Sequence, residues 1–145
     1  MPLLHLNSAG ELPEGVHQAT IDDILARFGS GSPQRQSVTA RLRHIYALAR
    51  ATGKLERLIL FGSYITAKPD PNDIDIVLVM RNDFDVHAYE EETRMLFDHP
   101  RAAEAFGASV FWIRPALLLE TLEEFIAHWQ ITRDQTRRGI VEVRE

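Results

Sequence analysis

The sequence predicts an α/β (α+β) fold, in which a small mixed β-sheet is flanked by helices. Short apolar runs that are typical of buried strands occur at residues 58–61, 73–79 and 108–113. Segments with apolar residues at helical spacing lie before these runs, between them and after the last one. Strands that alternate with helices form a sheet covered by helices. Because 145 residues is the length of one domain, we expect a single domain over residues 1–145.

The first third of the chain is predicted to be turns followed by two helices. Residues 1–19 are rich in turn-forming residues, and we expect them to wrap around the surface. A helix is predicted over residues 21–28, because Thr20 can cap its N-terminus and acidic residues fall in its first turn. A second helix follows the Gly- and Ser-rich linker at residues 29–33 and is expected to end near Thr52.

The second half of the chain is predicted to hold three further helices and a last strand. Two helices are expected over about residues 86–97 and 101–106. A third begins at Pro115 and carries an apolar stripe as far as Trp129. The apolar residues at 139–143 predict a short strand at the edge of the sheet.

The most informative stretch runs from Leu58 to Met80 and reads LILFGSYITAKPDPNDIDIVLVM. Its first strand stops at Gly62 and Ser63, where a residue without a side chain lets the backbone approach an anion closely. Its second strand opens with two aspartates separated by one apolar residue. The stretch therefore joins a possible phosphate-binding turn to a pair of carboxylates.

The two carboxylates, Asp73 and Asp75, fit a divalent cation. Side chains alternate across a strand, so both lie on one face while Ile74 and Ile76 point to the apolar face. Like charges on one face of a strand repel each other. Mg²⁺ relieves this repulsion, because it takes oxygen ligands and typically binds one or two carboxylates together with substrate phosphates. The alternative is a plain strand–loop–strand with an acidic pair at the surface; the glycine–serine turn at the end of the preceding strand favours the metal site.

The loop between the two strands, at residues 64–68, contributes a positively charged side chain. We expect the loop to begin with a helical turn whose N-terminus faces phosphate. Lys68 is the residue in it that could neutralise a phosphate charge. An ordinary surface lysine is an equally good interpretation of Lys68.

The order apolar–Gly–Ser, a spacer of about ten residues and then Asp–apolar–Asp–apolar resembles the signature of the polymerase-beta-like nucleotidyltransferase superfamily. The resemblance extends to small uncharacterised bacterial domains with a minimal nucleotidyltransferase-like fold. It implies that Asp73 and Asp75 hold Mg²⁺ (or Mn²⁺) and that Gly62, Ser63 and Lys68 seat the triphosphate of an NTP. The features outside the motif that carry this likeness are Leu12-Pro13-x-Gly15-x-His17, Arg27-Phe28-Gly29 and Gly139-Ile140-Val141.

One part of the superfamily pattern is absent from the sequence. Catalytic members take a third carboxylate from a later strand, which completes the metal site and helps to deprotonate the acceptor hydroxyl. The corresponding strand at residues 108–113 contains no acidic residue, and Ser109 stands where the aspartate is expected. Serine is a poor metal ligand and cannot act as a base near neutral pH. Glu104 and Glu120 lie nearby in sequence, but both fall on predicted helices.

Two functions are compatible with this pattern. The resemblance implies a Mg²⁺-dependent nucleotidyltransferase that moves a nucleoside monophosphate from an NTP to a hydroxyl of a protein or an RNA. Small members of the superfamily act in this way in toxin–antitoxin or phage-defence pairs. The alternative, favoured by Ser109, is a catalytically degenerate module of the same fold that serves as a binding partner or antitoxin.

The composition excludes several other classes of protein. No cysteine is present, so neither a disulfide framework nor a cysteine-based zinc site is expected. No apolar run approaches the length of a membrane-spanning helix, and we expect a cytoplasmic protein that does not bind membranes. The net charge of −5 argues against binding of long DNA, which requires a basic surface.

Overall fold

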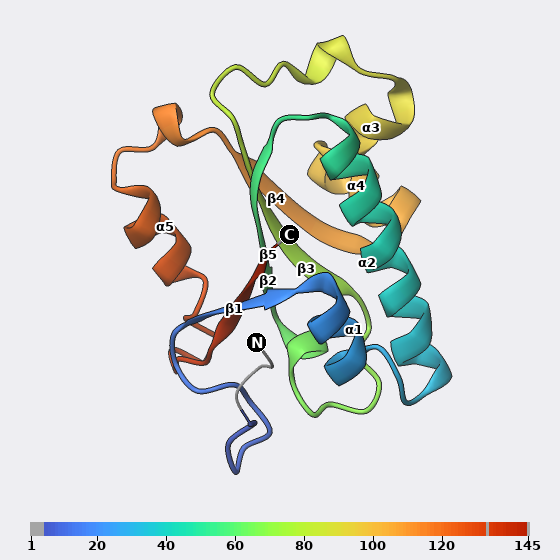
Figure 1. The fold of residues 1–145 in the computed structure, drawn as a ribbon, viewed down its shortest axis with the longest axis vertical. Coiled ribbons are helices and arrows are strands. Elements are labelled where there is room, and N and C mark those ends of the chain that lie inside the picture. The colour runs from blue at the N-terminus through green and yellow to red at the C-terminus, as the bar shows by residue number, and fades with distance from the viewer. Residues whose placement is uncertain (1–4, 133, 145) are drawn as a thin grey trace.

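The computed structural model describes residues 5–132 and 134–144, and five strands in this part of the chain form one sheet. The strands are β1 (Val16–Thr20), β2 (Leu55–Phe61), β3 (Ile74–Met80), β4 (Ala108–Ile113) and β5 (Ile140–Arg144). Their order across the sheet is β1–β5–β2–β3–β4 (Figure 1). The outer pairs β1–β5 and β3–β4 are parallel, whereas β5–β2 and β2–β3 are antiparallel. The predicted α/β (α+β) class with a mixed sheet is confirmed.

Helices cover both faces of the sheet. They are α1 (Ile21–Phe28), α2 (Pro33–Ala51), α3 (Glu91–Leu96), α4 (His99–Phe106) and α5 (Leu122–His128), with 3₁₀ turns η1 (Ser63–Ile65), η2 (Val86–Ala88) and η3 (Pro115–Leu117). Helices α1 to α4 pack on one face, where they bury Leu60, Ile76 and Leu78 in the larger core. Helix α5 packs on the other face and buries Ile59 and Val77 through Ile126 (Figure 1).

Local capping explains where the first two helices begin. The Thr20 hydroxyl accepts a hydrogen bond from the Asp23 backbone N–H at 3.1 Å, and the Asp23 carboxylate accepts one from the Thr20 N–H. This reciprocal pair satisfies donors that the first turn of α1 leaves open. At α2 the Ser32 hydroxyl accepts a hydrogen bond from the Arg35 backbone N–H at 3.1 Å, and Pro33 occupies the first turn, where a missing N–H costs nothing. The predicted bounds of both helices are confirmed to within a residue.

The N- and C-terminal strands differ from the prediction. The segment 1–19, of which residues 1–4 lie outside the described part, was expected only to wrap the surface, but it ends in β1. Because β1 pairs with β5, the strand expected at the sheet edge lies inside the sheet, between β1 and β2. In β1 only Ala19 is buried, and Val16 is 37% exposed. Such a strand has no apolar run by which the sequence could reveal it.

The helices of the second half also differ from the prediction. The helix expected over residues 86–97 is divided into η2 and α3, because Tyr89 has an extended backbone. The Tyr89 ring stacks on Phe84, and its hydroxyl donates to the Thr52 carbonyl at 3.0 Å. The helix expected from Pro115 starts instead as η3, and α5 begins at a new cap on Thr121. In α4, which was expected over 101–106, Pro100 lies in the first turn and does not precede the helix.

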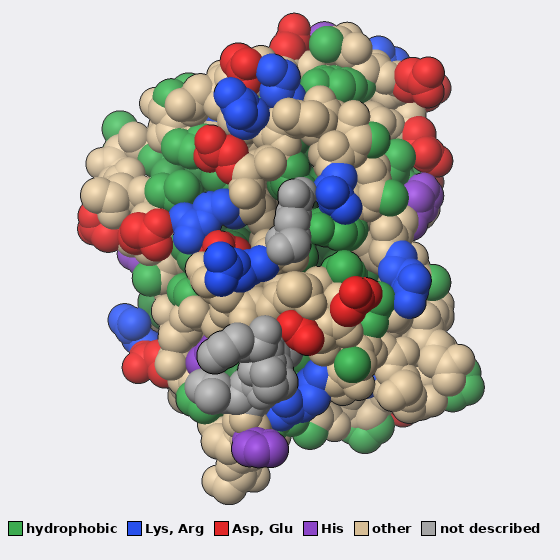
Figure 2. All heavy atoms as spheres, in the orientation of Figure 1, with side chains coloured by type: hydrophobic (Ala, Val, Ile, Leu, Met, Phe, Trp, Pro, Cys, Tyr) green, Lys and Arg blue, Asp and Glu red, His purple; other side chains and the backbone are tan. Residues whose placement is uncertain are grey.

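The surface view shows acidic and basic side chains interspersed on one face, without a continuous area of either charge (Figure 2). Within the described residues, no helix combines the length and the apolar character that crossing a bilayer requires.

Candidate functional site

The residues singled out from the sequence meet in one pocket at the end of the sheet. The pocket has a volume of about 510 Å³ and lies where β2 ends and β3 begins. All six predicted positions line it: Gly62, Ser63, Lys68, Asp73, Asp75 and Ser109. The structure thus brings the two halves of the motif to one place, although the role of each residue stays a prediction.

Strand pairing explains how the six positions meet. In the β2–β3 pair Asp75 lies opposite Phe61, and Gly62 and Ser63 follow directly in the chain. In the β3–β4 pair the same Asp75 lies opposite Ser109. Ile74 on the other face of β3 is fully buried beneath the larger core, so the Asp75 side chain lies on the face of α5. Asp75 is therefore the centre of the arrangement.

Gly62 approaches Asp75 so closely that no other residue fits its position. Its backbone has φ +82° and ψ −166°, a conformation that is essentially restricted to glycine. A Cβ atom there would overlap the Asp75 Oδ2 atom and lie 2.8 Å from its Cγ. The turn after β2 and the carboxylate of β3 therefore form one unit, with backbone pressed against the acidic side chain.

Several polar groups around the pocket have no partner in the described part of the chain. Among residues 5–132 and 134–144, neither the Ser63 hydroxyl, the Lys68 ammonium nor the Asp73 carboxylate makes a hydrogen bond or an ion pair with another side chain or with backbone. Ser63 and Asp73 are half-buried, and Lys68 is exposed. These groups are free to interact with a ligand.

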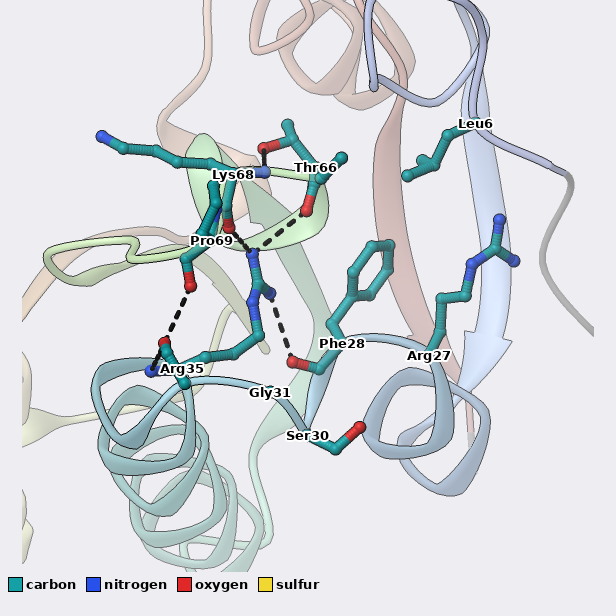
Figure 3. A pocket seen from close by; sticks show the side chains of 11 residues that line it. Leu6, Arg27, Phe28, Ser30, Gly31, Arg35, Thr66, Lys68 and Pro69 are labelled. Carbon is teal, nitrogen blue, oxygen red and sulfur yellow. Dashed lines mark hydrogen bonds between the residues drawn. The ribbon is translucent and has the colours of Figure 1, made fainter.

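A buried arginine fixes the loop that carries Lys68. Arg35 of α2 is 5% exposed and donates hydrogen bonds to the carbonyls of Tyr64 at 2.7 Å and Thr66 at 3.1 Å. It also donates to the carbonyls of Phe28 and Lys68 (Figure 3). The loop therefore wraps around the guanidinium with its carbonyls inward, while the Lys68 side chain points away from Arg35 (Figure 3). Burial lowers the pKa of Arg35, and nearby Tyr64 opposes this effect.

Tyr64 is the second anchor of this loop. It is fully buried, and its hydroxyl lies 2.8 Å from the Thr39 hydroxyl. Because the Thr39 hydroxyl donates to the Arg35 carbonyl, Tyr64 is the donor in that pair. Burial raises the pKa of Tyr64, and the bond to Thr39 acts in the opposite direction. Helix α2 thus holds the loop after β2 through a charged and a neutral side chain.

Ser109, for which the resemblance implies the place of a third carboxylate, lies opposite Asp75 in the β3–β4 pair; the equivalence of the two positions stays a prediction. Glu104 and Glu120 do not line the pocket, and Glu120 forms an ion pair with His128 at 3.6 Å. Glu11 and Asp134 do line it, and the Glu11 carboxylate accepts a hydrogen bond from Arg138 at 3.0 Å. In the described part of the chain, no three His, Cys, Asp or Glu side chains are grouped as a metal site.

The two aspartates fit Mg²⁺ better than a metal that needs a full set of protein ligands. Asp73 and Asp75 supply two carboxylates with hard oxygen donors, and both line the same pocket. Mg²⁺ commonly binds through one or two carboxylates and takes its remaining ligands from water and substrate phosphates. The residues present are therefore compatible with Mg²⁺ delivered together with a phosphate-bearing substrate.

Comparison with known protein families places the chain in one family. Residues 4–144 match the family of unknown function DUF6932. The chain is a member of DUF6932. Neither the curated proteins nor the solved structures gave a significant match.

Sequence reasoning missed several residues that line the pocket of this DUF6932 protein. They come from the N-terminal turn and from the segment after α5: Glu11, Trp129, Ile131, Thr132, Asp134, Thr136 and Arg138. Trp129 was expected only as the end of an apolar stripe. No local pattern marks the others, because they reach the pocket through the pairing of β5 with β1 and β2.

Proposed function

We propose that the protein is a minimal Mg²⁺-dependent nucleotidyltransferase, which transfers a nucleoside monophosphate from an NTP to a hydroxyl of a protein or an RNA. The bond between the α- and β-phosphates breaks, and pyrophosphate leaves. The observation that carries the proposal is the close contact between the glycine–serine turn and the Asp75 carboxylate in one pocket. The sequence resemblance described above supports it. Fold alone does not define function, so the proposal rests on the chemistry of these residues.

Each group around the pocket has a role in this proposal. Asp73 and Asp75 would hold Mg²⁺ (or Mn²⁺), which when bound neutralises charge on the triphosphate. Because Gly62 has no side chain, the turn can lie directly against the Asp75 carboxylate, which places its backbone beside the terminal phosphates of a metal-bound NTP. The Ser63 hydroxyl donates a hydrogen bond to a phosphate oxygen, and the Lys68 ammonium supplies a positive charge to the same group.

The acceptor hydroxyl must lose a proton, and Ser109 cannot accept it near neutral pH. Two further carboxylates line the pocket, Glu11 and Asp134. The Glu11 carboxylate is already engaged, because it accepts a hydrogen bond from Arg138 at 3.0 Å and forms an ion pair with it. Asp134, on the loop between α5 and β5, is therefore the group that we assign to this proton transfer.

A second function is favoured by one observation. Ser109, which has no carboxylate, lies opposite Asp75 in the β3–β4 pair. In this second function the domain binds Mg²⁺ and an NTP but does not transfer the nucleoside monophosphate. The protein would then act as a nucleotide-dependent binding partner or antitoxin of another protein.

The test is transfer of label from each of four α-labelled NTPs to components of a cell extract in the presence of Mg²⁺. Wild type is compared with Asp73→Asn/Asp75→Asn and with Asp134→Asn. Asp70→Asn is the matched control, because Asp70 lies in the loop before β3, as Asp73 does, but does not line the pocket. Label transfer that the double variant abolishes supports the enzyme. Mg²⁺-dependent binding without any transfer supports the binding module.

A further inference from the structure

The wall of the pocket beside the phosphate-binding turn is apolar. Phe61, Trp129, Ile131 and Ile140 line the same pocket as Gly62. The Trp129 ring lies against Phe61, with centroids 4.7 Å apart, and against Phe111 at 5.0 Å. Because Phe61 precedes Gly62 in the chain and pairs with Asp75 across the sheet, this wall begins directly beside the carboxylates.

This apolar wall is not sealed into the core. Ile131 is 41% exposed, and Phe61 and Trp129 are only partly buried. The Trp129 indole N–H has no hydrogen-bond partner among the described residues, and none of their buried side-chain nitrogens lacks a partner. The Trp129 N–H is therefore open to solvent. Trp112, on the other face of the sheet, differs: its N–H donates to the Phe97 carbonyl at 2.8 Å.

We propose that Trp129, together with Phe61 and Ile131, binds the nucleobase of the NTP, an inference that rests on the proposed function. A base has a flat apolar face and a polar edge, and tryptophan offers both a flat face and a donor. Stacking on an aromatic side chain strengthens binding of a base by about 5-fold to 150-fold. The pocket volume of about 510 Å³ falls within the range of sites that enclose small ligands.

The character of the wall also predicts which bases bind. Phe61, Ile131 and Ile140 have no side-chain group that could read a base edge, and the single donor of Trp129 finds an acceptor on every base. The nearby Thr132 and Thr136 hydroxyls bond each other at 2.7 Å. Stacking without such contacts tolerates every base. We therefore expect all four NTPs to bind, with ATP and GTP ahead of CTP and UTP because purines have the larger face.

The experiment separates the phosphate half of the site from the base half. Mg²⁺-ATP and Mg²⁺-tripolyphosphate are titrated into wild type, Trp112→Phe and Trp129→Leu, with affinities from calorimetry and with tryptophan fluorescence. In Trp112→Phe the emission comes from Trp129 alone. We expect ATP to quench it and tripolyphosphate to leave it unchanged. Trp129→Leu keeps an apolar side chain and should weaken ATP binding by about 5-fold or more without changing tripolyphosphate binding; circular dichroism verifies that both variants fold.

The outcomes distinguish the claim that the apolar wall binds the base from the proposed function, which requires the phosphate site. Equal affinities of wild type for ATP and tripolyphosphate would overturn the base-binding wall while leaving the phosphate site intact. Quenching of Trp129 by ATP, without any binding of tripolyphosphate, would support the wall and count against the proposed function. Failure of both ligands to bind would overturn both claims.

Discussion

At the scale of one residue, Gly62 matters because it lies in close contact with the Asp75 side chain. Its positive φ is not unusual in itself, because Gly53 at the end of α2 has φ +70°. The two positions differ in their surroundings: a Cβ at Gly53 would meet nothing within 4 Å, whereas a Cβ at Gly62 would overlap Asp75. A side chain at Gly62 would therefore meet both an unfavourable backbone conformation and the carboxylate, whereas one at Gly53 would meet only an unfavourable φ.

We expect Gly62→Ala to lower the free energy of unfolding by about 1–3 kcal/mol more than Gly53→Ala. The additional loss arises because the new methyl group must displace the Asp75 side chain or the turn. Urea denaturation of the two variants and wild type measures the difference. Equal losses in the two variants would mean that Gly62 and Asp75 are not in close contact in solution.

Ser109 provides a second test at the scale of one residue. Because it lies opposite Asp75 in the β3–β4 pair, Ser109→Asp places a third carboxylate beside the proposed metal ligands. Without metal, repulsion should cost about 0.2–1 kcal/mol of stability relative to Ser109→Asn. With Mg²⁺ at about 100 times its dissociation constant, binding should add about 2.7 kcal/mol. Thermal unfolding with and without Mg²⁺ measures both effects.

The asparagine variant is the control for Ser109→Asp, since it has nearly the same shape and no charge. If Mg²⁺ shifts the melting temperature of both variants equally, the new carboxylate does not reach the metal. The place that the superfamily pattern assigns to Ser109 would then be wrong for this protein.

At the scale of elements, the loop after β2 is held in place by α2. The Arg35 guanidinium donates hydrogen bonds to four backbone carbonyls, and three of these belong to residues 64–68. Tyr64 adds a buried hydroxyl that donates to Thr39. A hydrogen-bonded arrangement of this kind prepares the loop before a ligand arrives, which lowers the entropy that binding would cost.

The raised pKa of Tyr64 predicts a dependence of stability on pH. Burial favours the neutral phenol, so the pKa in the folded state lies above that in the unfolded state. The stability that Tyr64 contributes is complete below pH of about 10 and is lost as the pH rises through the folded-state pKa. Urea denaturation between pH 8 and pH 11 should therefore show a steeper fall for wild type than for Tyr64→Phe.

The same comparison of wild type with Tyr64→Phe also shows which result would contradict this prediction. Tyr64→Phe also loses one hydrogen bond, which should cost about 1 kcal/mol at neutral pH. If the curves of the two proteins stay parallel up to pH 11, ionisation of Tyr64 does not contribute to alkaline unfolding.

Elements with a strong local signal could be predicted from the sequence. Helix α1 has a cap, acidic residues in its first turn and an apolar stripe, and its bounds matched. Strand β3 was predicted because both its pattern and its position after a Pro-rich loop are local. The helix over 86–97 was wrong because the contacts of Tyr89 with Phe84 and Thr52 interrupt it. The bond to Thr52 joins residues 37 positions apart, so local periodicity does not contain it.

At the scale of the whole molecule, the topology decides which residues share the pocket. Strand β5 lies between β1 and β2. This arrangement brings the N-terminal turn with Glu11 and the loop with Asp134 beside the motif at residues 62–75. The motif residues could be predicted to meet, because they flank two adjacent strands. Trp129 and Asp134 could not, because their place depends on a strand pairing that spans nearly the whole chain.

The central claim is that Asp73 and Asp75, with the turn at Gly62 and Ser63, bind an NTP through Mg²⁺. Calorimetric titration of ATP into wild type and into Asp73→Asn/Asp75→Asn, each with Mg²⁺ and with EDTA, tests it most directly. We predict binding that requires Mg²⁺ and is at least about 100-fold weaker in the double variant, a difference of about 2.7 kcal/mol. Equal ATP affinity in the two proteins, or binding that EDTA leaves unchanged, would contradict the claim.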